Sequence, residues 1–120
     1  MAAKILFVED EPLARNLFCQ VLRNEGYRVI EAGDGTEALE LLQTQHVDLV
    51  ISDVRMPRMD GVALARHIVS SQPITPIFLM TAYQFDSRED ISALNVPCLG
   101  KPFSFDQLLS RIRKSLGEER

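Results

Sequence analysis

Four short apolar runs in this chain each end where a charged or hydroxyl-bearing side chain begins. The runs and the residues that follow them are 5–8 before Glu9 and Asp10, 47–52 before Asp53, 77–80 before Thr81, and 96–100 before Lys101. The carboxyl ends of parallel strands share one edge of a sheet, and open α/β sheets bind their ligands at that edge. If these runs are parallel strands, three carboxylates, one hydroxyl and one ammonium meet in a single crevice.

Strand-like and helix-like patterns alternate along the chain. Five helices are predicted: one from Pro12, one over residues 36–45, one after Asp60, one over about residues 86–94 and one after Ser104. Residues 27–31 add a fifth strand. Asp60 is a predicted N-cap, and Ser104 with Gln107 has capping-box spacing. The alternation predicts an α/β fold, a flavodoxin-like (βα)5 three-layer sandwich whose five-stranded parallel sheet has the order 2-1-3-4-5.

Length, charge and cysteine content narrow the class of protein. At 120 residues we expect one domain over residues 1–120, with no output domain in this chain. The sequence leaves open whether it is a free-standing protein or a fragment.

The net charge of -4 gives no case for direct nucleic-acid binding. No apolar stretch reaches the ~20 residues that span a bilayer, and no signal-peptide pattern is present. Cys19 and Cys98 form no recognisable disulfide framework, so we expect reduced thiols and a cytoplasmic location without membrane contact.

The acidic residues after the first and third runs suit a hard divalent cation. Mg2+ takes oxygen ligands and keeps several waters, so one or two carboxylates are enough to hold it. Asp53 can also act as a nucleophile that forms an acyl phosphate, and the backbone carbonyl of Arg55 is a candidate further ligand. Purely structural roles stay open for single residues, namely a helix N-terminus for Glu9 and Asp10 and an Asx turn for Asp53.

Thr81 and Lys101 suit the oxygens of a phosphoryl group. The hydroxyl can donate a hydrogen bond, and the ammonium supplies a compact positive charge. Phosphoryl transfer depends mostly on positioning and charge neutralisation, which this set of groups provides. The Lys101-Pro102 bond is also a candidate cis peptide. Suitable groups at four separate strand ends favour a phosphoryl site over four unrelated structural roles.

Three segments resemble the motifs of response-regulator receiver domains. They are Asp53-Val-Arg-Met-Pro-Arg-Met-Asp-Gly61, Met80-Thr-Ala82 and Lys101-Pro-Phe103, and the similarity begins at Lys4-Ile-Leu-Phe-Val-Glu-Asp-Glu11. The resemblance implies two-component signalling, in which Asp53 accepts a phosphoryl group from the phosphohistidine of a sensor histidine kinase or phosphotransfer protein. It implies Mg2+ as cofactor, with Asp10 a direct ligand and Glu9 a ligand through water. Thr81 would be the switch hydroxyl and Lys101 the phosphate-binding lysine.

The resemblance also implies what the domain does after phosphorylation. Receivers switch a protein-interaction surface and hydrolyse their own acyl phosphate, so we expect autophosphorylation and autodephosphorylation but no conventional enzyme activity. Arg55 and Tyr83 match the positions that flank the path of the attacking water, and their bulk predicts slow hydrolysis. The downstream protein target is not named by the sequence, and homodimerisation is left open.

Two departures from the family pattern concern the output face. Cys98 stands where the family carries an aromatic switch residue, and either Tyr83 or Phe85 is a candidate replacement. The segment between Thr81 and Lys101 is short, which predicts a reduced fourth helix. A constitutive, non-phosphorylated receiver-like interaction module is therefore the alternative function.

Two other classes fit the residues less well. A small aspartyl-phosphate phosphatase typically carries a second aspartate two positions after its nucleophile, where this chain has Arg55. A flavin-binding domain of the same fold needs a phosphate loop after the first strand, where this chain has Glu9-Asp10-Glu11.

Overall fold

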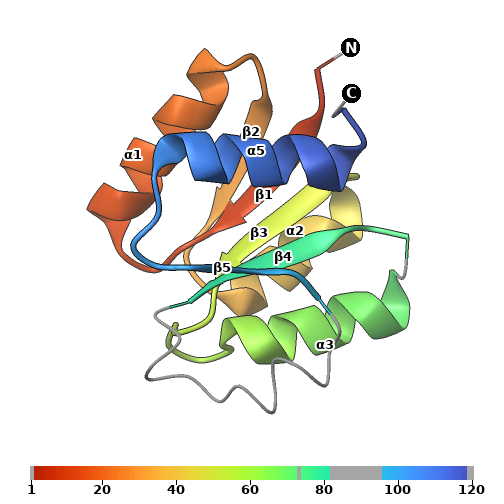
Figure 1. The fold of residues 1–120 in the computed structure, drawn as a ribbon. Helices are drawn as coiled ribbons and strands as arrows, with labels where there is room; N and C mark the ends of the chain where they lie inside the picture. Colours follow the sequence, from red (N-terminus) through yellow and green to blue (C-terminus); the bar gives the residue numbers. More distant parts are fainter. Residues whose placement is uncertain (1, 73, 82–95, 119–120) are drawn as a thin grey trace.

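The computed structural model describes residues 2–72, 74–81 and 96–118. Five parallel strands form one sheet in the order β2-β1-β3-β4-β5, which confirms the predicted topology (Figure 1). The strands are β1 (Lys4–Val8), β2 (Arg28–Ala32), β3 (Leu49–Asp53), β4 (Ile77–Thr81) and β5 (Cys98–Gly100).

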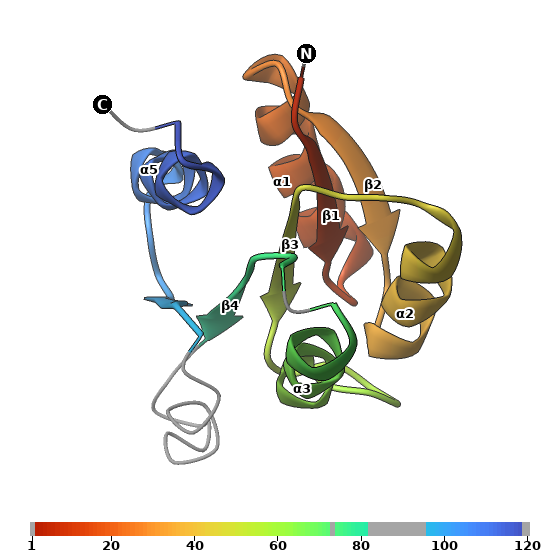
Figure 2. The same ribbon diagram turned by 90° about the vertical axis from the view of Figure 1, so that its right-hand side faces the viewer.

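Helices cover both faces of the sheet. The helices in the described residues are α1 (Pro12–Asn24), α2 (Gly35–Thr44), α3 (Gly61–Ser71) and α5 (Phe105–Leu116). Figure 2 shows α1 and α5 on one side of the sheet and α2 and α3 on the other, which gives the predicted three layers. The helix predicted at about residues 86–94 lies outside the described residues.

The sheet divides the apolar core into two parts, because successive residues of a strand point to opposite faces. On the α1 and α5 side, Phe7, Ile51 and Phe78 pack with the buried faces of both helices. On the α2 and α3 side, Leu6, Val50 and Leu79 do the same. Every residue of β3 and β4 is buried, as expected for central strands covered on both faces. The ends of these two strands are therefore firmly held.

Helix starts are set by side-chain caps, mostly where the sequence predicted them. Asp60 accepts a hydrogen bond from the Ala63 N–H, and Ser104 and Gln107 form the predicted capping box. The start of α2 differs from the prediction. The helix predicted over residues 36–45 begins one residue earlier, at Gly35, and Asp34 is its N-cap.

The apolar stripe of α1 is split between the core and the surface. Leu22 is fully buried with Cys19, whereas Leu13 is 81% exposed and Leu17 is 51% exposed. Leu13, Leu17, Val21 and Leu22 have the spacing of one continuous helical face. The rotation of α1 on the sheet instead turns its Cys19 side inward, which leaves the first two leucines in solvent.

Cys19 is buried in α1 and Cys98 is half-buried in β5, and no disulfide joins them. Among the described residues, no helix combines the length and the apolar character that crossing a bilayer requires.

Candidate functional site

The parallel register brings the carboxyl ends of the strands to one level of the sheet. Asp53, the last residue of β3, pairs with Met80 of β4, and Thr81 pairs with Gly100 of β5. Each reactive side chain therefore lies at the end of its strand or directly after it. Lys101 follows β5 without a break, and its backbone N–H donates to the Thr81 carbonyl at 2.7 Å.

Three carboxylates gather at this edge. One oxygen each from Glu9, Asp10 and Asp53 lies within 4.8 Å of the other two. Glu9 is 4% exposed and Asp53 is 8% exposed, whereas Asp10 is open to solvent. Clustered oxygen donors, part buried and part accessible to water, match what a hard divalent cation such as Mg2+ requires.

The electrostatics of the cluster indicate a shortage of positive charge. The pKa of Glu9 is raised from 4.5 to about 7, mainly by burial and in addition by the neighbouring Asp53 and Asp10 carboxyl groups. The Glu11 N–H, which donates to Glu9 Oε2 at 3.1 Å, and the Lys101 ammonium act in the opposite direction. A cation bound among these oxygens would favour their ionised forms.

Lys101 is the ammonium that faces the cluster. Its Nζ donates to Asp53 Oδ1 at 3.1 Å and lies 4.0 Å from Glu9 Oε1. The Val54 N–H donates to the same Asp53 oxygen at 3.0 Å. These two donors fix the orientation of the Asp53 carboxylate. The Lys101–Pro102 peptide is cis, as predicted.

Of the remaining predicted residues, Thr81 and Arg55 are close to Asp53 in the chain or in the sheet. Thr81 is 3% exposed and ends the strand beside it. Arg55 is exposed in the loop of residues 54–60 that follows Asp53, so the role of its carbonyl stays a prediction. Tyr83 and Phe85, the candidate aromatic replacements, lie outside the described residues.

Gly61 shapes the site in a way that the sequence reasoning missed. A Cβ atom at Gly61 would lie 2.2 Å from the Asp53 carbonyl oxygen, so only glycine fits there. Its N–H donates to the Val54 carbonyl at 2.9 Å and closes the 54–60 loop on itself. The sequence pattern predicts an N-cap role for Asp60 and no packing role for Gly61, although a glycine at this point also permits close backbone approach.

A group of phenylalanine rings around Phe18 adjoins the acidic cluster, and the sequence pattern does not predict it. The Phe18 ring of α1 lies 5.5 Å from Phe7, 5.9 Å from Phe103 and 5.6 Å from Phe105, measured between ring centroids. A mostly apolar hollow beside these rings extends to the site residues Glu9 and Lys101. The other residues that line it are Ala14, Phe18, Pro102 and Phe103. Low-dielectric surroundings of this kind strengthen the interactions of the charged groups at the site's edge.

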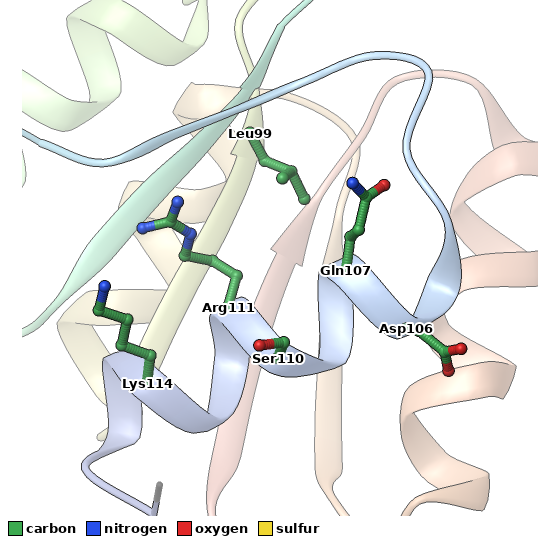
Figure 3. A pocket seen from close by; sticks show the side chains of 6 residues that line it. All are labelled: Leu99, Asp106, Gln107, Ser110, Arg111 and Lys114. Atoms are coloured by element: carbon green, nitrogen blue, oxygen red, sulfur yellow. The ribbon is translucent and has the colours of Figure 1, made fainter.

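A second, open hollow lies along α5, away from the acidic cluster. Its lining residues are Leu99, Asp106, Gln107, Ser110, Arg111 and Lys114. Figure 3 shows Leu99 of β5 reaching toward α5 while the Asp106 side chain points away from it. None of the predicted site residues lines this hollow, so it is separate from the site at the strand ends.

Comparison with known proteins places the chain in a family. The family model described as the response regulator receiver domain matches residues 5–113. The transcriptional regulatory protein PdtaR of Mycobacterium tuberculosis is 40% identical over 98% of this chain, which spans 58% of PdtaR. The sensor kinase CckA of Brucella abortus is 36% identical over 98% of this chain, which spans 13% of CckA.

Solved structures agree with the sequence matches. The response regulator TrrA of Thermotoga maritima, solved in complex with Mg2+-BeF, has a TM-score of 0.87 and 37% identity, and covers 97% of this chain and 100% of its own. The chemotaxis response regulator CheY4 of Vibrio cholerae has a TM-score of 0.85 and 32% identity, with coverage of 97% and 100%. The chain therefore belongs to the response regulator receiver domain family, whose members serve two-component signalling.

Proposed function

We propose that Asp53 accepts a phosphoryl group in a Mg2+-dependent reaction and that the modified domain acts as a signalling switch. The observation that carries this proposal is the environment of the Asp53 carboxylate. It is buried at the end of β3, within 4.8 Å of two further carboxylates, and it accepts a hydrogen bond from the Lys101 ammonium. A structural aspartate needs no such combination of acidic neighbours and a facing lysine.

The proposed metal ligands are oxygen atoms. Asp10 and Asp53 would bind directly, Glu9 would bind through water, and the Arg55 carbonyl would complete the protein's contribution. The clustered carboxylates support this assignment, as does the Mg2+-BeF complex of TrrA. When bound, Mg2+ would neutralise the carboxylates and the charge that develops on the phosphoryl oxygens.

The chain's own residues would carry out the transfer. An Asp53 oxygen attacks the phosphorus of a phosphohistidine, the P–N bond breaks, and the imidazole leaves with its electron pair as an acyl phosphate forms. The Lys101 ammonium, which is held 3.1 Å from Asp53 Oδ1, would bind an oxygen of the new phosphoryl group. The Thr81 hydroxyl would donate to another. The Val54 N–H, which donates to Oδ1 at 3.0 Å, keeps the nucleophile oriented.

The signal would leave the site through Thr81. Its carbonyl accepts from the Lys101 N–H, so the end of β4 and the start of the loop after β5 are mechanically joined. A pull of the phosphoryl group on the Thr81 hydroxyl would shift the chain that follows β4 and bias a protein-interaction surface, in the manner of ordering switches. The domain would also hydrolyse its own acyl phosphate, without being a conventional enzyme.

The proposed partners follow from this chemistry. The phosphoryl donor is a sensor histidine kinase or phosphotransfer protein, and the recipient of the signal is a downstream protein. Residues 1–120 would work as one receiver domain in the cytoplasm, where ATP-derived phosphohistidines are formed.

Intact-mass analysis after incubation with acetyl phosphate and Mg2+ tests the proposal. We expect wild type to gain the mass of one phosphoryl group, and to gain none when a chelator removes Mg2+. Asp53→Asn should gain none in either condition, whereas the exposed control Asp106→Asn should behave as wild type. A wild type that stays unmodified would contradict the proposal and favour a constitutive interaction module. Equal modification of Asp53→Asn would contradict the assignment of Asp53 as the acceptor.

A further inference from the structure

An ion pair outside the acidic cluster attaches the 54–60 loop to the start of α2. The Arg58 Nε donates to Asp34 Oδ2 at 2.7 Å, and the Arg58 Nη2 donates to the same oxygen. The Asp34 side chain is 5% exposed, whereas that of Arg58 is 69% exposed. The arginine therefore reaches from the surface to a carboxylate that is almost fully buried.

Asp34 is anchored independently of Arg58. Its Oδ1 accepts from the Glu37 N–H at 2.9 Å as the N-cap of α2. This hydrogen bond, followed by those from Arg58, keeps the pKa of Asp34 below its ordinary value. Because the helix holds the carboxylate in place, Arg58 is bound to a fixed and ionised partner.

A backbone hydrogen bond also joins the loop to the start of α2, one residue after Arg58 and Asp34. The Gly35 N–H donates to the Met59 carbonyl at 3.0 Å, and a Cβ at Gly35 would lie 2.7 Å from Met59 Cγ. Arg58 itself has a φ of 64°, a conformation that is unfavourable for a residue with a side chain. Such a conformation persists where surrounding contacts hold it. The tip of the loop is thus held by both side-chain and backbone contacts.

The two ends of the same loop are fixed at the proposed phosphorylation site. Asp53 precedes it directly, and the Gly61 N–H closes it onto the Val54 carbonyl at 2.9 Å. Arg55, whose carbonyl is the proposed metal ligand, lies between these fixed points. With its base and its tip both held, the loop has little freedom to move that carbonyl.

We propose that Arg58 and Asp34 are positioning residues for the Mg2+ site, because their ion pair holds the loop that carries Arg55 at the carboxyl edge of the sheet. This inference rests on the proposed function. Neither residue is within the acidic cluster, so both act on the site only through the loop.

Mg2+ titration followed by NMR or calorimetry tests the inference without any phosphorylation. We expect Arg58→Ala to weaken Mg2+ binding about tenfold, a size typical of changes to groups that orient metal ligands. Arg58→Lys should restore part of the loss, because it keeps the charge but not the two-nitrogen contact. Arg23→Ala is the matched control, since Arg23 pairs with Glu31 at 3.1 Å on another part of the surface. Its Mg2+ affinity should equal that of wild type.

A double-mutant cycle and hydrogen exchange separate positioning from general loss of structure. Asp34→Asn removes the charge but keeps a good N-cap, so α2 should stay intact. If the pair acts as one unit, the double variant should bind Mg2+ no more weakly than Arg58→Ala alone. Amide exchange should speed up at Gly35, whose N–H donates to the Met59 carbonyl, and stay unchanged in the middle of β3.

The outcomes distinguish this inference from the proposal on which it rests. Wild-type protein that binds no Mg2+ would overturn both. Wild-type binding that is matched by Arg58→Ala would overturn the positioning role alone, and so would additive losses in the double variant.

Discussion

The Lys101 ammonium lies 3.1 Å from Oδ1 of Asp53, although 48 positions separate the two residues in the sequence. The same nitrogen is 4.0 Å from Glu9 Oε1. One cation thus connects the ends of β1, β3 and β5 and opposes part of the negative charge of the cluster. The contact depends on the parallel pairing of the strands, which brings their carboxyl ends to the same edge of the sheet.

Replacing Lys101 should slow phosphorylation. Lys101→Met removes the ammonium that we expect to bind a phosphoryl oxygen, and a lost charged hydrogen bond of about 1.5–3 kcal/mol corresponds to a rate about 10- to 100-fold lower. The measurement is the rate of mass gain with acetyl phosphate at saturating Mg2+. Lys114→Met on α5 is the control and should react at the wild-type rate. Equal rates for Lys101→Met and wild type would show that this ammonium has no part in the transfer.

Removing one carboxylate should stabilise the metal-free protein. Asp10→Asn relieves repulsion within a cluster whose oxygens lie within 4.8 Å, so its unfolding temperature in chelator should exceed that of wild type. Added Mg2+ should raise the unfolding temperature of wild type, because a ligand that binds the folded state stabilises it. The variant should gain much less. Thermal unfolding with and without Mg2+ checks both points, and an Asp10→Asn protein that gains as much as wild type would exclude Asp10 as a ligand.

Shortening Arg55 should shorten the life of the phosphorylated state. Its side chain is exposed two positions after Asp53, where we expect it to restrict the attacking water. Phosphorylated Arg55→Ala should therefore lose its phosphoryl group several-fold faster, and the double variant Arg55→Ala/Tyr83→Ala should lose it faster still. The decay is followed by intact mass after removal of acetyl phosphate, with Arg111→Ala as the control. Decay that is no faster in the double variant than in wild type would count against a shielding role.

The buried thiol of Cys19 should make stability fall in alkaline solution. Burial raises the pKa of Cys19 from 9.0 to about 12. Between these values the unfolded chain loses the thiol proton while the folded chain keeps it, so the free energy of unfolding falls as the pH rises. Denaturant unfolding at several pH values should show a steeper fall for wild type than for Cys19→Ala. Parallel curves for the two proteins would mean that the thiol titrates alike in both states.

The fold was predictable because its signals are local. Apolar runs and helical spacing identified all five strands and the four helices of the described residues, and Asp60 and Ser104 marked helix starts correctly. Boundaries were less accurate. β3 was expected over residues 47–52, but its ladder begins at Leu49 and includes Asp53. The ends of a ladder depend on hydrogen bonds to neighbouring strands, which one segment does not specify.

The site was predictable only in part, for a related reason. Residues at strand ends could be expected to meet once the sheet was parallel, and the structure does bring together Glu9, Asp10, Asp53 and Lys101. The Arg58 and Asp34 pair joins two loops whose approach is set by the packing of α2 and α3. The local sequence pattern does not determine how α2 and α3 pack, so this contact could not be predicted from the sequence.

Chemical trapping of the acyl phosphate tests the central claim most directly. Borohydride reduces an aspartyl phosphate to homoserine, so peptide mass spectrometry after treatment with acetyl phosphate, Mg2+ and borohydride identifies the acceptor residue. We predict homoserine at position 53 in wild type, and none at that position when Mg2+ is chelated. Homoserine at another position, or its absence from a protein that has gained a phosphoryl group, would contradict the claim that Asp53 is the acceptor.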